Sequence, residues 1–219
     1  MAERTIRRRN RPNRYSDELL LGAAAEVFHE RGFHEASMLD IAERAGATKP
    51  TLYARFGSKE ALYDLAMERI ADSMIARMAE AYERAQADAP EDATQRCCEA
   101  FFDWVKSNPV GFHLLLATDH GAPTGIDHRQ RALTSLTDLL VDAMAAYLRS
   151  LGERPGPATG LIAAYAVGVF DYGARWAVEN DALDRLDMPS FTATFTLRGL
   201  QGLSPDVVSS LLRRRKRAA

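Results

Sequence analysis

The stretch SMLDIAERAGATKPTLYARFGSK, residues 37–59, predicts two short helices joined by a tight turn. Ser37 can cap the first helix while Asp40, three residues later, bonds back to it, which is the reciprocal arrangement of a capping box. Met38 and Ile41 can bury one face of this helix. Gly46 then supplies the left-handed backbone that ends it, so the chain must turn there.

The second helix is expected over Lys49–Phe56, with Thr48 as its N-cap. Pro50 fits the first helical turn, where the amide hydrogens have no acceptor within the helix. Leu52 and Phe56 lie four residues apart and would anchor the helix to a core. The side chains left to face elsewhere are those of Lys49, Pro50, Thr51, Tyr53 and Arg55.

The charge of this stretch is segregated, with four cations and no carboxylate from Arg44 through Lys59. Such clustering attracts the phosphates of a DNA duplex, and side chains at 49–51 could reach base edges in the major groove. Lys59 follows the N-cap Ser58, where backbone amides already favour an anion. The stretch therefore predicts a helix-turn-helix that docks on DNA, in preference to a solvated helical hairpin.

The segment from about Arg14 to Leu65 resembles the DNA-binding domain of the TetR family of transcriptional regulators. The runs AAAEVFHERGFHEAS (23–37), DIAERAGATKPTLYARF (40–56) and SKEALY (58–63) carry the resemblance. It implies that DNA, mostly its phosphates, is contacted by Ser37, Thr48, Lys49, Thr51, Tyr53, Arg55 and Lys59, with residues 49–51 nearest the bases. Many relatives have Val and His where this chain has Ala47 and Arg55.

The first 14 residues hold six arginines against one glutamate, and Pro12 argues against a folded helix. We expect a mobile basic arm, with Arg14 among its DNA contacts, that lies in the minor groove or along the backbone. A targeting peptide is the alternative, but no apolar run follows the arginines.

Helical patterns cover nearly all of the chain, and no alternating run suggests a strand. An all-α fold is therefore expected, with a disordered arm (1–14), a three-helix helix-turn-helix domain (15–60), a helical regulatory and dimerisation domain (61–203), and a short helix with a basic tail (204–219). The further helices are expected at Ser16–Arg31, Lys59–Ala87, 90–107, 108–119, Asp127–Leu151, Ala158–Asn180 and Pro189–Gly202.

The helix at 158–180 is apolar almost all round, so it must be buried inside one domain or between two chains. The family resemblance implies a homodimer through the last two large helices. Two reading helices about 34–36 Å apart would then enter successive major grooves of a pseudo-palindromic operator.

The resemblance also implies a ligand cavity in the second domain. Aromatic and apolar side chains that could line it are Phe101, Phe102, Trp104, His113, Leu116, Tyr165, Tyr172 and Trp176. Each of them is equally explained as ordinary core. Asp171 and Arg175 lie four apart and can pair on their helix.

The composition favours a soluble cytoplasmic protein without a membrane partner, because 219 residues with 47% apolar content contain no run of about 20 apolar residues. Cys97 and Cys98 are adjacent, which disfavours a disulfide and gives no zinc spacing. We expect no cofactor and no metal.

An enzyme is the first rival class. His113, His120 and His128 with Asp119 and Asp127 suggest metal or acid-base chemistry, but they flank a loop at long spacings. No HExxH, CxxC, GxSxG or phosphate-loop motif occurs, so a catalytic role is not expected.

These features together predict a homodimeric repressor that leaves its operator when a small apolar or amphipathic effector enters the second domain. The alternative is a constitutive or architectural DNA-binding factor without an inducer.

Overall fold

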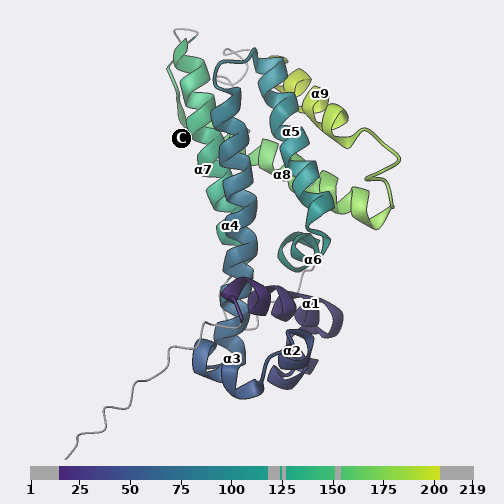
Figure 1. Ribbon diagram of the computed structural model, residues 1–219. Helices are drawn as coiled ribbons and strands as arrows, with labels where there is room; N and C mark the ends of the chain where they lie inside the picture. The colour runs from purple at the N-terminus through teal and green to yellow at the C-terminus, as the bar shows by residue number, and fades with distance from the viewer. Residues whose placement is uncertain (1–14, 118–123, 125–126, 151–153, 203–219) are drawn as a thin grey trace, which may run out of the picture. The chain divides into compact units, whose positions relative to one another are not determined.

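The computed structural model describes residues 15–117, 124, 127–150 and 154–202, and across these residues it contains helices and no strand (Figure 1). The expected all-α fold is confirmed. The arm with Arg14, the histidine at 120 and the short helix expected after residue 203 lie outside the described residues. The chain divides into two compact units between residues 66 and 67.

The first unit consists of α1 (Asp17–Glu35), α2 (Met38–Arg44), α3 (Lys49–Phe56) and the start of α4 (Lys59–Ala85). Each helix contributes apolar side chains with almost no exposed surface to one core. These include Leu20, Val27 and Phe28 of α1, Ile41 of α2, Leu52 of α3 and Leu62 of α4. The core fixes α2 and α3 by their inner faces, which leaves their outer faces free to bind.

The first helix is longer than the sequence indicated. Gly32 has a φ of 73°, as expected for a helix terminator, but helical turns resume after it and α1 reaches Glu35. Phe33 lies in this added turn, and its ring centroid is 5.9 Å from that of Phe28 and 5.2 Å from that of Tyr63. Ring packing therefore draws the chain back onto the core after the glycine.

The second unit continues along α4 and adds α5 (Pro90–Ser107), α6 (Pro109–Phe112), the π-helical turn η1 (His113–Ala117), α7 (His128–Ser150), α8 (Pro157–Glu179) and α9 (Met188–Gln201). Helix α5 packs on α9, α7 packs on α8, and α8 also packs on α9 (Figure 1). In the described part of the chain, no helix is long and apolar enough to span a membrane. The single helix expected at 108–119 is instead α6 followed by η1.

Cys97 and Cys98 lie on the buried face of α5 as free thiols. Burial raises the pKa of the Cys97 thiol to about 11 and that of Cys98 to about 12. Because the thiolate is the reactive form, both groups should be poor nucleophiles at neutral pH.

We expect iodoacetamide at pH 8 to label the folded protein at least about a hundredfold more slowly than the protein in denaturant. Above about pH 9 the two thiols ionise in the unfolded protein but stay neutral in the folded protein, because burial raises their pKa there. Ionisation then favours the unfolded state, so the free energy of unfolding should decline as pH rises from about 9 toward 11. Mass spectrometry of labelled peptides and denaturation at several pH values measure the two effects. Equal labelling rates in the folded and unfolded protein would contradict the burial.

Candidate nucleic-acid interface and ligand cavity

Side-chain caps fix the N-terminal ends of α2 and α3. Ser37 Oγ accepts a hydrogen bond from the Asp40 amide at 3.2 Å, and Asp40 Oδ2 accepts one from the Ser37 amide at 3.0 Å, so the predicted capping box is confirmed. Gly46 takes a φ of 61° in the turn. Thr48 then caps α3 by accepting from the Thr51 amide at 3.3 Å. The local sequence thus determines where both helices begin.

Helix α3 is held by one face and exposed on the other. Leu52 is fully buried, whereas Thr48, Lys49, Pro50 and Tyr53 are exposed. Thr51 is half-buried, and its hydroxyl lies 2.8 Å from that of Thr48. The Lys49 ammonium lies 5.8 Å from the centroid of the Tyr53 ring. We call the surface formed by residues 48–51 and Tyr53 the reading face.

Two of the four clustered cations have carboxylate partners on α1. Arg44 pairs with Glu26 at 2.8 Å and with Glu30 at 2.5 Å. The hydrogen bond from Arg44 lowers the pKa of Glu30. Arg55 pairs with Asp17 at 3.1 Å and also donates to the carbonyl of Tyr15. Their positive charge is therefore partly neutralised within the unit, and Lys49 is the exposed cation of the reading face.

Lys59 connects the start of α4 to the end of α1. Its ammonium donates to the carbonyls of Phe33 at 2.8 Å, His34 at 3.3 Å and Ala36 at 3.0 Å. It also lies 4.5 Å from the centroid of the Phe33 ring. A lysine has three N–H donors, and these contacts use all of them. A phosphate contact by Lys59 would have to replace or share one of these bonds.

We expect Lys59→Ala to lower the free energy of unfolding by about 1–2 kcal/mol, because three carbonyls at a helix end lose a charged donor. Lys49→Ala removes an equal charge from an exposed site and should change stability by less than about 0.5 kcal/mol. Urea denaturation of the two variants compares these losses. Equal stability of both variants would show that the Lys59 contacts contribute nothing to the fold.

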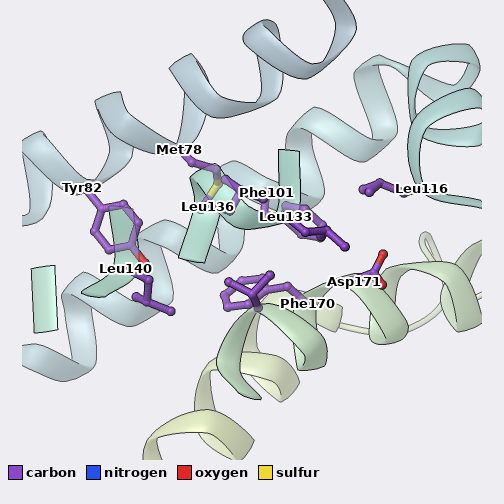
Figure 2. A pocket seen from close by; sticks show the side chains of 10 residues that line it. Met78, Tyr82, Phe101, Leu116, Leu133, Leu136, Leu140, Phe170 and Asp171 are labelled. Carbon is purple, nitrogen blue, oxygen red and sulfur yellow. The ribbon is translucent and has the colours of Figure 1, made fainter. Parts of the chain in front are cut away.

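The second unit contains a small cavity among α4, α5, α7, α8 and η1. Its volume is about 20 Å³, and eight of its ten lining side chains are apolar. Figure 2 shows Asp171 and Leu116 at one end and Tyr82 and Leu140 at the other. A cavity of this volume holds about one water molecule, so it is too small for a larger ligand in this conformation, and we call it the closed cavity.

A wider, more open hollow of about 350 Å³ lies between α7 and α8. It shares Leu133, Val167 and Asp171 with the closed cavity. Its other lining residues are mostly polar and include Gln130, Thr134, Thr137 and Asp138. An apolar cavity and a polar groove therefore meet at these three residues, an arrangement that suits an amphipathic molecule.

The comparisons with known proteins agree along most of the chain. The family model of bacterial regulatory proteins, tetR family, matches residues 20–66, which include the reading face. The HTH-type transcriptional activator FasR of Mycolicibacterium smegmatis is 32% identical over 183 residues, which is 83% of this chain and 81% of the relative. This chain belongs to the TetR family. It is therefore a DNA-binding transcriptional regulator.

Solved structures of TetR-like regulators share the fold. A TetR-like transcriptional regulator from Rhodococcus sp. RHA1 has a TM-score of 0.67 at 25% identity and covers 85% of this chain and 96% of its own. FadR of Bacillus subtilis, solved in complex with stearoyl-CoA, has a TM-score of 0.70 at 18% identity and covers 86% and 100%. The N-terminal helix-turn-helix and the C-terminal helical unit are thus those of a TetR family regulator.

The residues that sequence reasoning proposed for a pocket are distributed over this TetR family regulator. Phe101 and Leu116 line the closed cavity. Phe102 and Trp104 are buried outside its lining, and the Trp104 indole donates to Ser73 Oγ at 3.0 Å. The other four have larger exposed fractions: His113 is half-buried, and Tyr165, Tyr172 and Trp176 are exposed.

Several long-range contacts of this TetR family regulator were not predicted from the sequence, and two of them bear on the candidate sites. The Tyr15 hydroxyl donates to the carbonyl of Gly46 at 2.8 Å, which ties the residue before the N-cap of α1 to the turn of the helix-turn-helix. Arg129 donates to Asp171 Oδ2 at 2.5 Å, in addition to the expected Asp171–Arg175 pair, which is 3.4 Å apart. The partners are 31 and 42 residues apart. No spacing rule joins residues at such separations.

Proposed function

We propose that this protein is a homodimeric, effector-responsive transcriptional regulator of the bacterial cytoplasm. It binds a pseudo-palindromic operator through α3 and leaves it when an amphipathic effector with an aliphatic portion occupies the helical unit. The observation that carries the proposal is the reading face, which combines an exposed ammonium, an exposed phenol, the exposed N-cap Thr48 and the half-buried Thr51 at a helix that Leu52 anchors.

The reading face supports DNA binding by its chemistry. Exposed hydroxyl, phenol and ammonium groups donate to phosphates, and Lys49 can also reach the acceptors of guanine in the major groove. We propose that Lys49, Pro50 and Thr51 lie nearest the bases and that Ser37, Thr48 and Tyr53 contact phosphates. Arg55 and Lys59, whose polar groups already have protein partners, complete the predicted set and act chiefly by fixing α3 and α4.

The homodimer is supported by an exposed apolar surface on α8 and α9. Leu161, Tyr165, Tyr172 and Trp176 recur on one face of α8 with exposed fractions of 44–69%. Phe191 and Phe195 of α9 are 68% and 59% exposed, and their rings stack at 6.3 Å. We call these six residues, five aromatic and one aliphatic, the aromatic face. So many exposed large apolar side chains on two adjoining helices are typical of a protein interface.

The closed cavity supports an effector response because any ligand must open it. Small-molecule sites generally occupy about 300–1,000 Å³. The closed cavity, at about 20 Å³, is far smaller than that. Entry of an aliphatic chain would displace side chains of α4, α7 and α8 together. A few kcal/mol of differential affinity between closed and open forms is enough to change operator occupancy substantially. A fatty acyl-CoA, the ligand in the FadR structure, is the effector class that we propose.

The expected sign is that of a repressor that the effector releases. FasR of Mycolicibacterium smegmatis is named an activator. Operator occupancy is the quantity that the effector changes under either sign, so the proposal is tested on DNA binding first.

The test is selection of bound fragments from randomised and bacterial genomic DNA by the purified protein, read by sequencing, with the double variant Lys49→Ala/Tyr53→Ala as control. We expect a palindromic motif that the variant does not enrich. Addition of stearoyl-CoA should then lower binding to that motif. A motif whose binding no acyl-CoA changes would favour the constitutive factor, and no motif at low or moderate salt would overturn specific regulation.

A further inference from the structure

Asp171 lies on α8 where the closed apolar cavity meets the open polar groove, and it lines both. Its side chain is only 9% exposed. Figure 2 shows its carboxylate at the cavity end near Leu116, away from Tyr82 and Leu140. Asp171 is the one charged residue among the three that line both spaces, so it is the charged group that a molecule extending from the groove into the cavity would meet.

The two oxygens of this carboxylate are used differently. Oδ2 accepts from Arg129 at 2.5 Å and from Arg175 at 3.4 Å. Oδ1 is buried and has no hydrogen-bond partner within the part of the chain that the structure describes. A buried polar atom without a partner is costly, and such atoms in folded proteins call for a specific explanation.

The surroundings of Oδ1 determine what could bind it. A carboxylate only accepts hydrogen bonds, so its missing partner is a donor. Neither Arg129 nor Arg175 is among the residues that line the cavity or the groove, so the charged group that lines both spaces is the Asp171 carboxylate. The groove adds a second carboxylate, Asp138, and neutral polar groups. At Oδ1 itself an anionic group is therefore a poor match, and a neutral donor is a good one.

We propose that Asp171 is a specificity-determining residue of the effector site and that Oδ1 accepts a hydrogen bond from a neutral donor, a hydroxyl or an amide N–H, adjoining an aliphatic chain. The aliphatic chain occupies the opened cavity, and the polar part continues into the groove. Arg129 and Arg175 position the carboxylate. This inference rests on the proposed effector response and specifies the chemistry of the ligand near its polar end.

The test compares three probes on the full-length protein by isothermal titration calorimetry. Decan-1-ol and methyl nonyl ether are isomers with the same number of heavy atoms, but only the alcohol donates a hydrogen bond. Decanoate carries a negative charge at the same end. We expect the alcohol to bind at least about tenfold more tightly than the ether, because the ether leaves a buried charged acceptor unpaired. Decanoate should bind more weakly than the alcohol.

Two variants test whether the Asp171 carboxylate causes the preference for the alcohol over the ether. Asp171→Asn should reduce the ratio of alcohol to ether affinity to within about threefold, since the acceptor loses its charge. Asp88→Asn makes the same change at a carboxylate that pairs with Arg96 and lines neither the cavity nor the groove, and it should leave the ratio unchanged. The ratio in the unaltered protein tests the proposal even where Asp171→Asn fails to fold.

Equal affinities for alcohol and ether would overturn the role of Asp171 while leaving an aliphatic effector site in place. Tightest binding of decanoate would overturn it in favour of Arg129 and Arg175 as the recognising groups. An unchanged ratio in folded Asp171→Asn would also overturn it. Binding of none of the three probes would overturn both this proposal and the aliphatic effector, whereas the operator selection tests DNA binding separately.

Discussion

The double variant Lys49→Ala/Tyr53→Ala is expected to bind operator DNA at least about a hundredfold more weakly than the unaltered protein and to fold equally well. Both side chains are exposed on α3, and the cation–π contact between them joins two surface residues and not the core. Each contact with a base edge or phosphate is worth about 1–3 kcal/mol, so the loss of two accounts for this factor.

Fluorescence anisotropy on the selected operator, at several salt concentrations, measures this loss. Removal of the Lys49 ammonium should also make the salt dependence shallower, because one fewer counterion per protomer is released. Lys106→Ala is the matched control: it deletes an exposed lysine that pairs with Asp184 in the second unit, and it should leave operator affinity unchanged. Unchanged affinity in the double variant, with native circular dichroism, would remove α3 from the proposed interface.

The double variant Tyr172→Glu/Phe195→Glu is expected to be monomeric at concentrations where we expect the unaltered protein to be a dimer. Both rings are more than half exposed on the aromatic face, so the isolated chain tolerates the change. At an interface, each carboxylate would lose its hydration without a partner, which costs several kcal/mol per site and is doubled by two-fold symmetry. Operator affinity should collapse with it, because one reading face alone makes half of the contacts.

Analytical ultracentrifugation over a range of protein concentrations measures the association directly. Leu65→Glu makes the same type of change at an exposed apolar residue of α4, and this control should stay dimeric. A double variant that sediments as the unaltered protein does would show that the aromatic face is not the dimer interface.

Most of the helix-turn-helix could be predicted from the sequence because its signals are local. The bonds that cap α2 and α3 each join residues three apart. Gly32, Gly46 and Gly57 all have a positive φ, which glycine adopts without strain. The extension of α1 beyond Gly32 could not be predicted. It depends on the rings of Phe28 and Tyr63, which only the folded core brings to Phe33.

The charge pattern shows where local reasoning stops. Arg44 and Lys49 are equivalent in a count of cations along the chain. In the structure, Arg44 lies between Glu26 and Glu30 of another helix, whereas Lys49 stays exposed. The sign of a charge is written in the sequence, but its availability to DNA depends on which carboxylates the packing of α1 against α2 places beside it.

The second unit shows the same division more strongly. The apolar character of residues 158–180 predicted a helix with several contacts, and α8 indeed packs on both α7 and α9. Periodicity could not separate the aromatic residues that line a cavity from those that lie on the surface. Phe101 became a cavity wall and Tyr172 part of an exposed face, although both occur in apolar helical runs.

The sequence by itself determined most of the helices, the caps of α2 and α3 and the family resemblance. The helices and caps could be predicted because each depends on residues within one or two helical turns of one another. Only the tertiary structure decided which cations are neutralised, which aromatics remain exposed and which atom at the cavity lacks a partner. Those properties depend on contacts such as Arg129 with Asp171, whose residues lie 42 positions apart and meet only when α7 packs on α8.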